Sequence, residues 1–157
     1  MKLKRSIALV IRESEGVRRR AGCGDGAPWL LVRRPDDDED LPGVWGLPAG
    51  TLAPDELPED LVRRIGREKL GVTIEPGAAV AKGTTVRATY DLEMDLWTAT
   101  IVAGDPDVAG EPDVADPGPG GRVAITRYAE WKWGDPAALE DGARAGSLCC
   151  RLGLALR

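Results

Sequence analysis

The segment that most constrains the fold is residues 58–70, where apolar residues recur at helical spacing. Leu61, Val62 and Ile65 fall on one side of such a helix. A proline at its start suits the first helical turn, and the two acids that follow complement the helix dipole. Gly71 suits the C-terminal cap. We therefore expect a helix over residues 58–70 that packs Leu61, Val62 and Ile65 beside a central mixed sheet.

Strands are expected on both sides of this helix. Residues 3–12 and 29–32 are compact apolar runs, and we expect the second strand to be antiparallel to the first. We expect residues 78–88 and 95–102 to form paired strands and residues 122–133 to form a last strand. We also expect Asp135-Pro136 to start a helix and Ser147 to cap a helical stretch through Leu156. This order of strands, helix, strands and helix predicts an α/β or α+β fold.

The length of 157 residues fits a single domain over residues 1–157. Three flexible loops are predicted. Residues 13–28 are rich in glycine, residues 36–40 are acidic, and residues 104–121 are rich in proline and contain a short duplication. Basic residues before the first apolar run resemble a secretion signal. However, the run is short and has no small-residue cleavage site, so a first strand is the favoured interpretation.

Residues 50–72 resemble the Nudix box, in which a glycine, a glutamate and an Arg-Glu-rich helix recur at fixed spacing. The matching positions are Gly50, Glu56, Arg64, Glu68, Gly71 and Val72. The flanking residues 31–34, 42–50 and 130–136 are also similar to MutT-like members, so the resemblance covers about residues 5–155. It implies a Nudix fold, with a mixed sheet sandwiched between helices. It also implies that Gly50, Glu56, Arg64 and Gly71 are structural residues of the box.

The resemblance further implies hydrolysis of a nucleoside diphosphate linked to another moiety, or of a nucleoside triphosphate, with Mg²⁺ or Mn²⁺. Three glutamates at helical positions i, i+3 and i+4 share one face and can hold hard cations through oxygen. The corresponding residues here are Ile65, Glu68 and Lys69, so two of the three carboxylates are absent. We expect a degenerate site that binds the metal weakly.

Two glutamates are the candidate catalytic residues and metal ligands. Glu68 is the remaining box carboxylate, although its spacing from Arg64 equally suits a surface ion pair. Glu93 alternates with Asp91 and Asp95, which places all three on one face of a strand. Some Nudix enzymes take an additional acid from such a strand or its loop. The alternative interpretation of Glu93 is a polar, solvated strand face.

Lys69, Arg33 and Trp45 are the candidate substrate-binding residues. The Lys69 ammonium would stand where a metal would, facing a phosphate. Its alternative role is a solvated cation that favours the helix C-terminus. Trp45 would stack on a base, with core packing as the alternative.

Composition excludes several classes of function. The net charge of −5 argues against a broad nucleic-acid surface, and no apolar run is long enough to cross a membrane. The absence of histidine excludes imidazole bases and histidine-bound zinc. The three cysteines lack C-x-x-C spacing and adjacent cysteines rarely pair, so a reduced, cytoplasmic protein is expected.

The favoured function is therefore a Nudix-type hydrolase with a small nucleotide or phosphate ligand. The alternatives are a non-catalytic Nudix domain that binds such a ligand and a protein-interaction module. The sequence leaves a homodimer open.

Overall fold

The computed structural model describes residues 2–12, 28–36, 41–87, 90–108 and 128–156. Its elements are β1 (Lys2–Ile11), β2 (Trp29–Arg33), β3 (Trp45–Gly46), β4 (Ala49–Thr51), α2 (Pro58–Ile65), η1 (Gly66–Leu70), β5 (Thr73–Val86), β6 (Tyr90–Ala103), β7 (Glu130–Gly134), η2 (Pro136–Leu139), α3 (Glu140–Arg144) and α4 (Leu148–Leu156). The three predicted loops lie mainly outside the described residues. Their described parts, at Pro28, Asp36 and residues 104–108, belong to no helix or strand.

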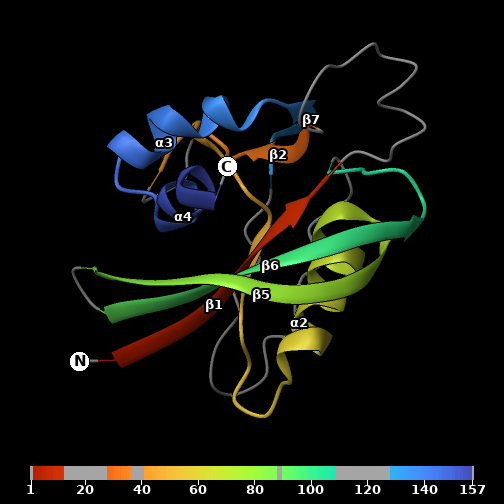
Figure 1. The fold of residues 1–157 in the computed structure, drawn as a ribbon, viewed down its shortest axis with the longest axis horizontal. Helices are drawn as coiled ribbons and strands as arrows, with labels where there is room; N and C mark the ends of the chain where they lie inside the picture. The colour runs from red at the N-terminus through yellow and green to blue at the C-terminus, as the bar shows by residue number, and fades with distance from the viewer. Residues whose placement is uncertain (1, 13–27, 37–40, 88–89, 109–127, 157) are drawn as a thin grey trace.

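Four strands form a mixed sheet in the order β4-β1-β6-β5 (Figure 1). β1 runs parallel to β6 and antiparallel to β4, while β5 runs antiparallel to β6. The apolar run Ile7–Ile11 lies at the centre of this sheet, and its residues are at most 3% exposed. The prediction of a strand here is therefore confirmed.

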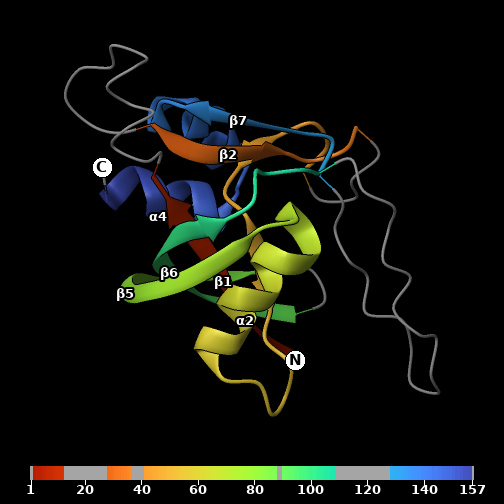
Figure 2. The ribbon, with the colours of Figure 1, turned by 90° about the vertical axis from the view of Figure 1, so that its right-hand side faces the viewer.

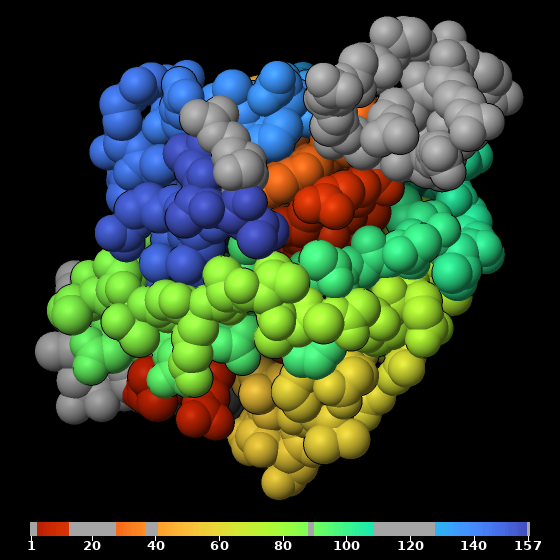
Figure 3. All heavy atoms as spheres, viewed as in Figure 1, coloured from red at the N-terminus to blue at the C-terminus, as the bar shows by residue number. Residues whose placement is uncertain are grey.

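Successive side chains of β1 point to opposite faces of the sheet, as in any strand, and a different helix layer covers each face. Ile7, Leu9 and Ile11 pack in one cluster with the buried face of α2. Ala8 and Val10 pack in a second cluster with α4 and the short helix η2. Figure 3 shows α2 in yellow and the C-terminal helices in blue on either side of the green strands. The predicted sandwich of a mixed sheet between helices is confirmed.

α2 buries Leu61, Val62 and Ile65, each at most 1% exposed, as the apolar spacing predicted. Full burial of such a side chain stabilises the fold by roughly 1.5–3 kcal/mol. Pro58 occupies the first turn together with two acids, which matches the predicted start of the helix.

The C-terminal part of the predicted helix is a π-helical turn, η1, rather than a continuation of the α-helix. Gly66 allows this turn to approach β5, since a Cβ there would lie 2.4 Å from Cγ1 of Ile74. Gly71 ends the turn with φ 66°, and its N–H bonds to the carbonyl of Gly66. A π turn widens the hydrogen-bond spacing to i→i+5. The side chains after Ile65 therefore depart from the i, i+3, i+4 spacing on which the sequence interpretation relied.

The second strand is antiparallel to β1 where the two meet, as predicted, but it does not join the first sheet. β2 lies between β3 and β7 in a separate three-stranded sheet, shown above the first sheet in Figure 2. A single antiparallel bridge joins Arg12 to Trp29. The reason is that β1 already has β4 and β6 as hydrogen-bonded neighbours on its two sides.

The remaining predicted elements are present with shifted ends. The paired strands β5 and β6 are longer than the predicted ranges, and β7 is shorter, with residues 122–127 outside the described part. Asp135 accepts a hydrogen bond from the N–H of Ala137 at 2.8 Å, and Ser147 accepts one from the N–H of Cys150 at 3.4 Å, so both caps are as predicted.

Among the described residues, no helix is long and apolar enough to span a bilayer.

Candidate functional site

Arg64 joins the loop before α2 to the helix itself. Its guanidinium makes two 2.8 Å bonds to the carboxylate of Glu56 and a third, of 2.9 Å, to the carbonyl of Thr51. Glu56 in turn accepts from the N–H of Ala53 at 3.1 Å. The Arg64 hydrogen bonds hold the pKa of Glu56 below its usual value, against the opposing effect of burial. The pair therefore fixes residues 51–56 against the first turns of the helix.

Gly50 and Ile65 meet where β4 packs on α2. A Cβ on Gly50 would lie 2.9 Å from Cγ1 of Ile65, so glycine permits this close approach. Ile65 is 1% exposed and belongs to the same buried cluster as Leu9 and Ile11. The first of the three box positions therefore points into the core.

Glu68 lies beside Arg64. Its Oε2 is 3.5 Å from Nη1 of Arg64, and about a quarter of its side chain is exposed. This is the i, i+4 ion pair that the sequence offered as one of two interpretations. A single contact at 3.5 Å leaves the carboxylate with unused acceptor capacity.

Lys69 extends from η1 towards the strand that begins the box. Its ammonium donates to the carbonyl oxygen of Ala49 and lies 5.5 Å from the centre of the Tyr128 ring. The Tyr128 hydroxyl is 3.2 Å from the same carbonyl and accepts from the N–H of Ala49 at 2.9 Å. Lysine and tyrosine thus converge on one backbone group, and Lys69 is not the fully solvated cation that one interpretation offered.

The surroundings of Lys69 oppose its charge. Burial, together with the nearby charges of Arg34 and Arg64 and against the effect of Glu68, lowers the pKa of Lys69 to about 8. Arg64 is itself paired with Glu56 and Glu68. An anion placed beside Lys69 would favour its charged form.

Arg33 and Trp45 stand opposite one another on β2 and β3. The Arg33 guanidinium is already paired with Asp36 at 3.0 Å and with Glu130 at 3.5 Å, and Glu130 is the main cause of its raised pKa. The ammonium of Lys132 lies 4.2 Å from the centre of the Trp45 ring. A ligand that uses either residue would have to displace these contacts.

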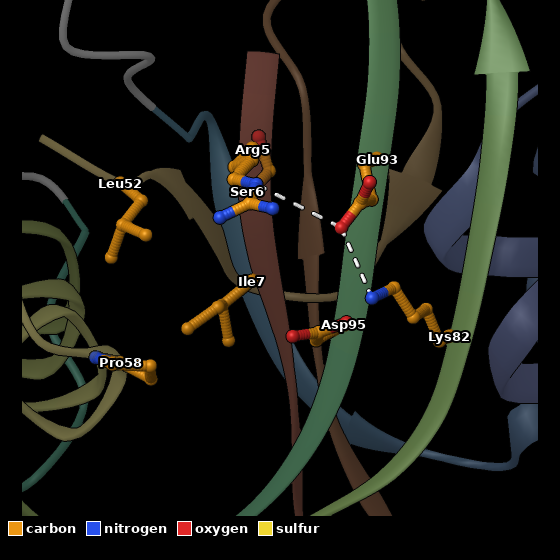
Figure 4. Close-up of a pocket in the computed structure, with 8 residues that line it drawn as sticks. All are labelled: Arg5, Ser6, Ile7, Leu52, Pro58, Lys82, Glu93 and Asp95. Carbon is orange, nitrogen blue, oxygen red and sulfur yellow. Dashed lines mark ion pairs between the residues drawn. The ribbon is translucent and has the colours of Figure 1, made fainter. Parts of the chain in front are cut away.

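Glu93 lies in a small pocket that is also lined by Pro58, the first residue of α2 (Figure 4). The pocket has a volume of about 130 Å³ and is lined by Arg5, Ser6, Ile7, Leu52, Pro58, Lys82, Glu93 and Asp95. Oε1 of Glu93 is 3.1 Å from the Lys82 ammonium and 3.8 Å from Nε of Arg5. Pro58 begins α2, whereas Glu68 lies in η1 beyond the end of α2 and does not line this pocket. The structure therefore does not bring the two candidate glutamates together.

The donor set at the box does not fit a divalent metal ion. One of the three box positions is a buried aliphatic side chain, another carries an ammonium, and Glu68 pairs with Arg64. Within the described part of the chain, no three acidic, histidine or cysteine side chains are grouped so that they could hold a metal ion. Hard cations need several oxygen ligands, preferably charged.

Arg34 and Tyr128 are site residues that the sequence interpretation missed. Arg34 follows the last residue of β2, and the sequence interpretation included it only among the flanking residues 31–34. Tyr128 precedes β7 and is 7% exposed. No sequence pattern around Tyr128 indicates its role, because its partner Ala49 is 79 positions away.

A comparison with protein families matches residues 5–146 to the model described as NUDIX domain. The chain belongs to the NUDIX family. The match contains most of β1, the whole box and η2 with α3, so it includes parts of both helix layers of the fold. A search of curated proteins gives no match.

Solved structures agree with this NUDIX fold. A MutT protein from Methanosarcina mazei Go1 is 18% identical with a TM-score of 0.61, over 89% of this chain and 82% of that one. The E. coli ORF135 protein is 24% identical with a TM-score of 0.62, over 100% and 92%. An ADP-ribose pyrophosphatase from Streptococcus suis 89-1591 is 15% identical with a TM-score of 0.56, over 98% and 90%. The predicted fold and family are therefore confirmed.

Proposed function

We propose that this NUDIX domain binds the phosphate groups of a nucleotide or nucleoside diphosphate derivative through cationic side chains in place of a box metal. The observation that carries the proposal is the position of Lys69. Its ammonium is held on the Ala49 carbonyl at the end of the box helix, where the family pattern has a glutamate.

Electrostatics favour an anionic ligand at this position. Lys69 is near Arg34 and Arg64, and burial together with the repulsion from these charges lowers its pKa to about 8. A phosphate oxygen would offset that repulsion and favour the charged ammonium. Binding should therefore take up a fraction of a proton near pH 8. Arg33 and Trp45 are proposed as contacts for the rest of the ligand, in competition with their present partners.

Calorimetry without metal tests this proposal. The full chain would be titrated with pyrophosphate, ADP and ADP-ribose in EDTA at pH 7 and pH 9. We expect at least one ligand to bind in EDTA and to bind more weakly at pH 9, and we expect Lys69→Met to reduce affinity tenfold or more. Lys82→Met is the matched control, because Lys82 is an exposed lysine that pairs with Glu93. Binding that requires Mg²⁺, or that Lys69→Met leaves unchanged, would contradict the proposal.

The second candidate is Mg²⁺- or Mn²⁺-dependent hydrolysis of a nucleoside diphosphate linked to another moiety, or of a nucleoside triphosphate. Membership of the family and the unused acceptor capacity of Glu68 favour it. In this candidate Glu68 is the first catalytic and metal-binding residue, and Glu93 is the second.

A substrate panel with and without each metal separates the two candidates. Metal-dependent product release that is lost in Glu68→Gln would establish hydrolysis, and Glu93→Gln would show whether the second carboxylate contributes. We expect divalent-metal affinity at the box to be weak, since one carboxylate provides too few ligands. A metal dissociation constant in the low micromolar range, lost on Glu68→Gln, would favour the hydrolase.

A further inference from the structure

Two adjacent cysteines at the start of α4 have no part in the proposed function. Cys149 and Cys150 are both free and buried in the described structure. Cys149 is 6% exposed, whereas Cys150 is 0% exposed. Both cysteines are therefore largely shielded from solvent.

Ser147 links the two cysteines. Its hydroxyl oxygen lies 3.3 Å from the sulfur of Cys149 and accepts from the N–H of Cys150 at 3.4 Å. The hydroxyl can donate its proton to the sulfur of Cys149 while one of its two lone pairs accepts from that N–H. This arrangement favours the thiolate form of Cys149.

The two sulfurs have opposite acid–base environments. Hydrogen bonds from Cys150, Ser147 and the Leu47 N–H, helped by the charge of Arg34, lower the pKa of Cys149 to about 6 although burial opposes this. The neighbouring Cys149 and burial raise the pKa of Cys150, while Ser147 and Arg34 oppose the rise. These surroundings therefore favour ionisation of Cys149 over ionisation of Cys150.

Both sulfurs also face the same strand. A Cβ on Gly46 would lie 3.4 Å from Sγ of Cys149 and 3.6 Å from Sγ of Cys150. The sulfur of Cys150 lies 3.4 Å from the carbonyl oxygen of Trp45, which is a second acceptor for its one proton besides the sulfur of Cys149. The groups that this segment presents to the pair are thus uncharged backbone atoms of residues 45–47.

We propose that Cys149 and Cys150 form an oxidisable dithiol that reacts with small hydroperoxides, with Cys149 as the attacking sulfur and Cys150 as the resolving sulfur. The pair is then a modification site separate from the box helix, because it lies on the opposite face of the sheet from α2. This inference does not rest on the proposed ligand.

The reaction balances without any further reactant. The Cys149 thiolate attacks one peroxide oxygen, the O–O bond breaks, and water or an alcohol leaves after taking up a proton, so that Cys149 becomes a sulfenic acid. The Cys150 sulfur then attacks the Cys149 sulfur. The S–S bond forms, the S–O bond breaks, and the hydroxide leaves as water with the Cys150 proton. The two sulfurs lose the two electrons that reduce the peroxide.

The resulting disulfide would be easily reversed. Adjacent cysteines close a small strained ring, and strained disulfides are the labile, readily reduced ones. The first turn of α4 would have to open, which breaks the Cys150 contacts with Ser147 and Trp45. The reduced pair is therefore the resting form in a reducing environment.

Peptide mass spectrometry tests the pair directly. Trypsin cleavage after Arg144 and Arg151 releases residues 145–151, which contain both cysteines, while Cys23 falls in a different peptide. Native full-length Cys23→Ser protein would be treated with hydrogen peroxide, alkylated under denaturing conditions and digested. We expect this peptide to lose two hydrogens, to resist alkylation, and to recover both thiols after dithiothreitol.

Single variants assign the two roles. In Cys150→Ser we expect a dimedone-reactive sulfenic acid on Cys149, whereas Cys149→Ser should leave Cys150 at least tenfold less reactive. In folded protein, the rate at which hydrogen peroxide oxidises Cys149 should rise with pH to a plateau above about pH 6. Ser147→Ala should slow this reaction several-fold. Urea-unfolded protein, in which the thiols regain a pKa of about 8.5, provides the comparison. Equal reactivity of the two single variants, a disulfide to Cys23 in wild-type protein, or the same pH profile in urea would overturn the proposal.

Discussion

The ammonium of Lys69 and the hydroxyl of Tyr128 meet at one acceptor, the carbonyl oxygen of Ala49. Ala49 begins β4, and Lys69 lies in the turn that ends the box helix, so the contact joins the two ends of the box. It places a positive charge where a metal-binding box would carry a negative one. The chemistry of this NUDIX domain therefore depends on how that charge is compensated.

Lys69→Met should stabilise the protein at neutral pH. Lys69 has its pKa lowered from 10.5 to about 8, mainly by burial, so the folded state holds this proton less tightly than the unfolded state. The penalty is complete below about pH 8 and disappears as pH rises towards 10.5. At 1.36 kcal/mol per pKa unit, discounted for partial exposure, we expect a gain of about 1–3 kcal/mol at pH 7.

Denaturant unfolding of both proteins between pH 6 and pH 10 measures this gain. The difference in the free energy of unfolding between Lys69→Met and the wild type should shrink as pH approaches 10. Lys82→Met should give a small difference at every pH, because the Lys82 side chain is 62% exposed. A destabilised Lys69→Met protein at pH 7 would mean that the bond to Ala49 outweighs the cost of burial.

Glu56→Gln should destabilise the protein by about 1–3 kcal/mol at pH 7, since it removes the charge from a bidentate pair with Arg64. The pKa of Glu56 is lowered by Arg64, so its contribution is present above the ordinary glutamate pKa and is lost as pH falls through the lowered value. The difference between wild type and variant should therefore narrow below about pH 4.

The exposed pair of Asp60 with Arg63 serves as the matched control for this measurement. Asp60→Asn should change the free energy of unfolding by less than about 1 kcal/mol. Similar losses in the two variants would show that the Glu56 pair is no stronger than a surface ion pair.

Gly66→Ala should be destabilising, although alanine favours helices over glycine by about 1 kcal/mol. The new Cβ would lie 2.4 Å from Cγ1 of Ile74 and 3.1 Å from the Val72 carbonyl. We expect a loss of about 1–3 kcal/mol from this overpacking. Thermal and denaturant unfolding would measure it.

Ile74→Ala should separate this clash from a loss of helix stability. Alanine removes the outer side-chain atoms of Ile74 that obstruct the new Cβ. In a double-mutant cycle, Gly66→Ala should therefore cost less in the Ile74→Ala background than in the wild type. An equal cost in both backgrounds would attribute the loss to the backbone of the π turn instead.

Restoring the box with Ile65→Glu and Lys69→Glu should produce a protein that Mg²⁺ stabilises. Ile65 is 1% exposed, so an unpaired carboxylate there should cost several kcal/mol unless a cation compensates. We expect the double variant to have a lower melting temperature than the wild type in EDTA and to recover part of it with Mg²⁺. We also expect Mg²⁺-dependent hydrolysis of at least one nucleoside diphosphate derivative above the wild-type rate.

The wild type assayed on the same panel is the essential comparison. A folded, Mg²⁺-binding double variant that cleaves nothing would indicate that the substrate cleft has diverged, which favours the binding function. A wild type that is already a fast Mg²⁺-dependent enzyme would show that other carboxylates carry the metal, with Glu93 the first to test.

The sequence by itself determined the features that depend on local spacing. Apolar residues at helical intervals identified the buried face of α2, and Asp135 and Ser147 marked the starts of the C-terminal helices. The spacing from Gly50 to Val72 identified the family. These signals succeed because caps and helix faces are set by residues within a few positions of one another.

Tertiary structure alone decided which distant groups meet. The Ala49 carbonyl is 20 positions from Lys69, and Ala49 is 79 from Tyr128. The spacing of Ile65, Glu68 and Lys69 implied one shared face, but the close approach of Gly66 to Ile74 accompanies a π turn that changes their directions. Packing between segments far apart in the chain sets such contacts, and a periodic pattern within one segment contains no information about its partner.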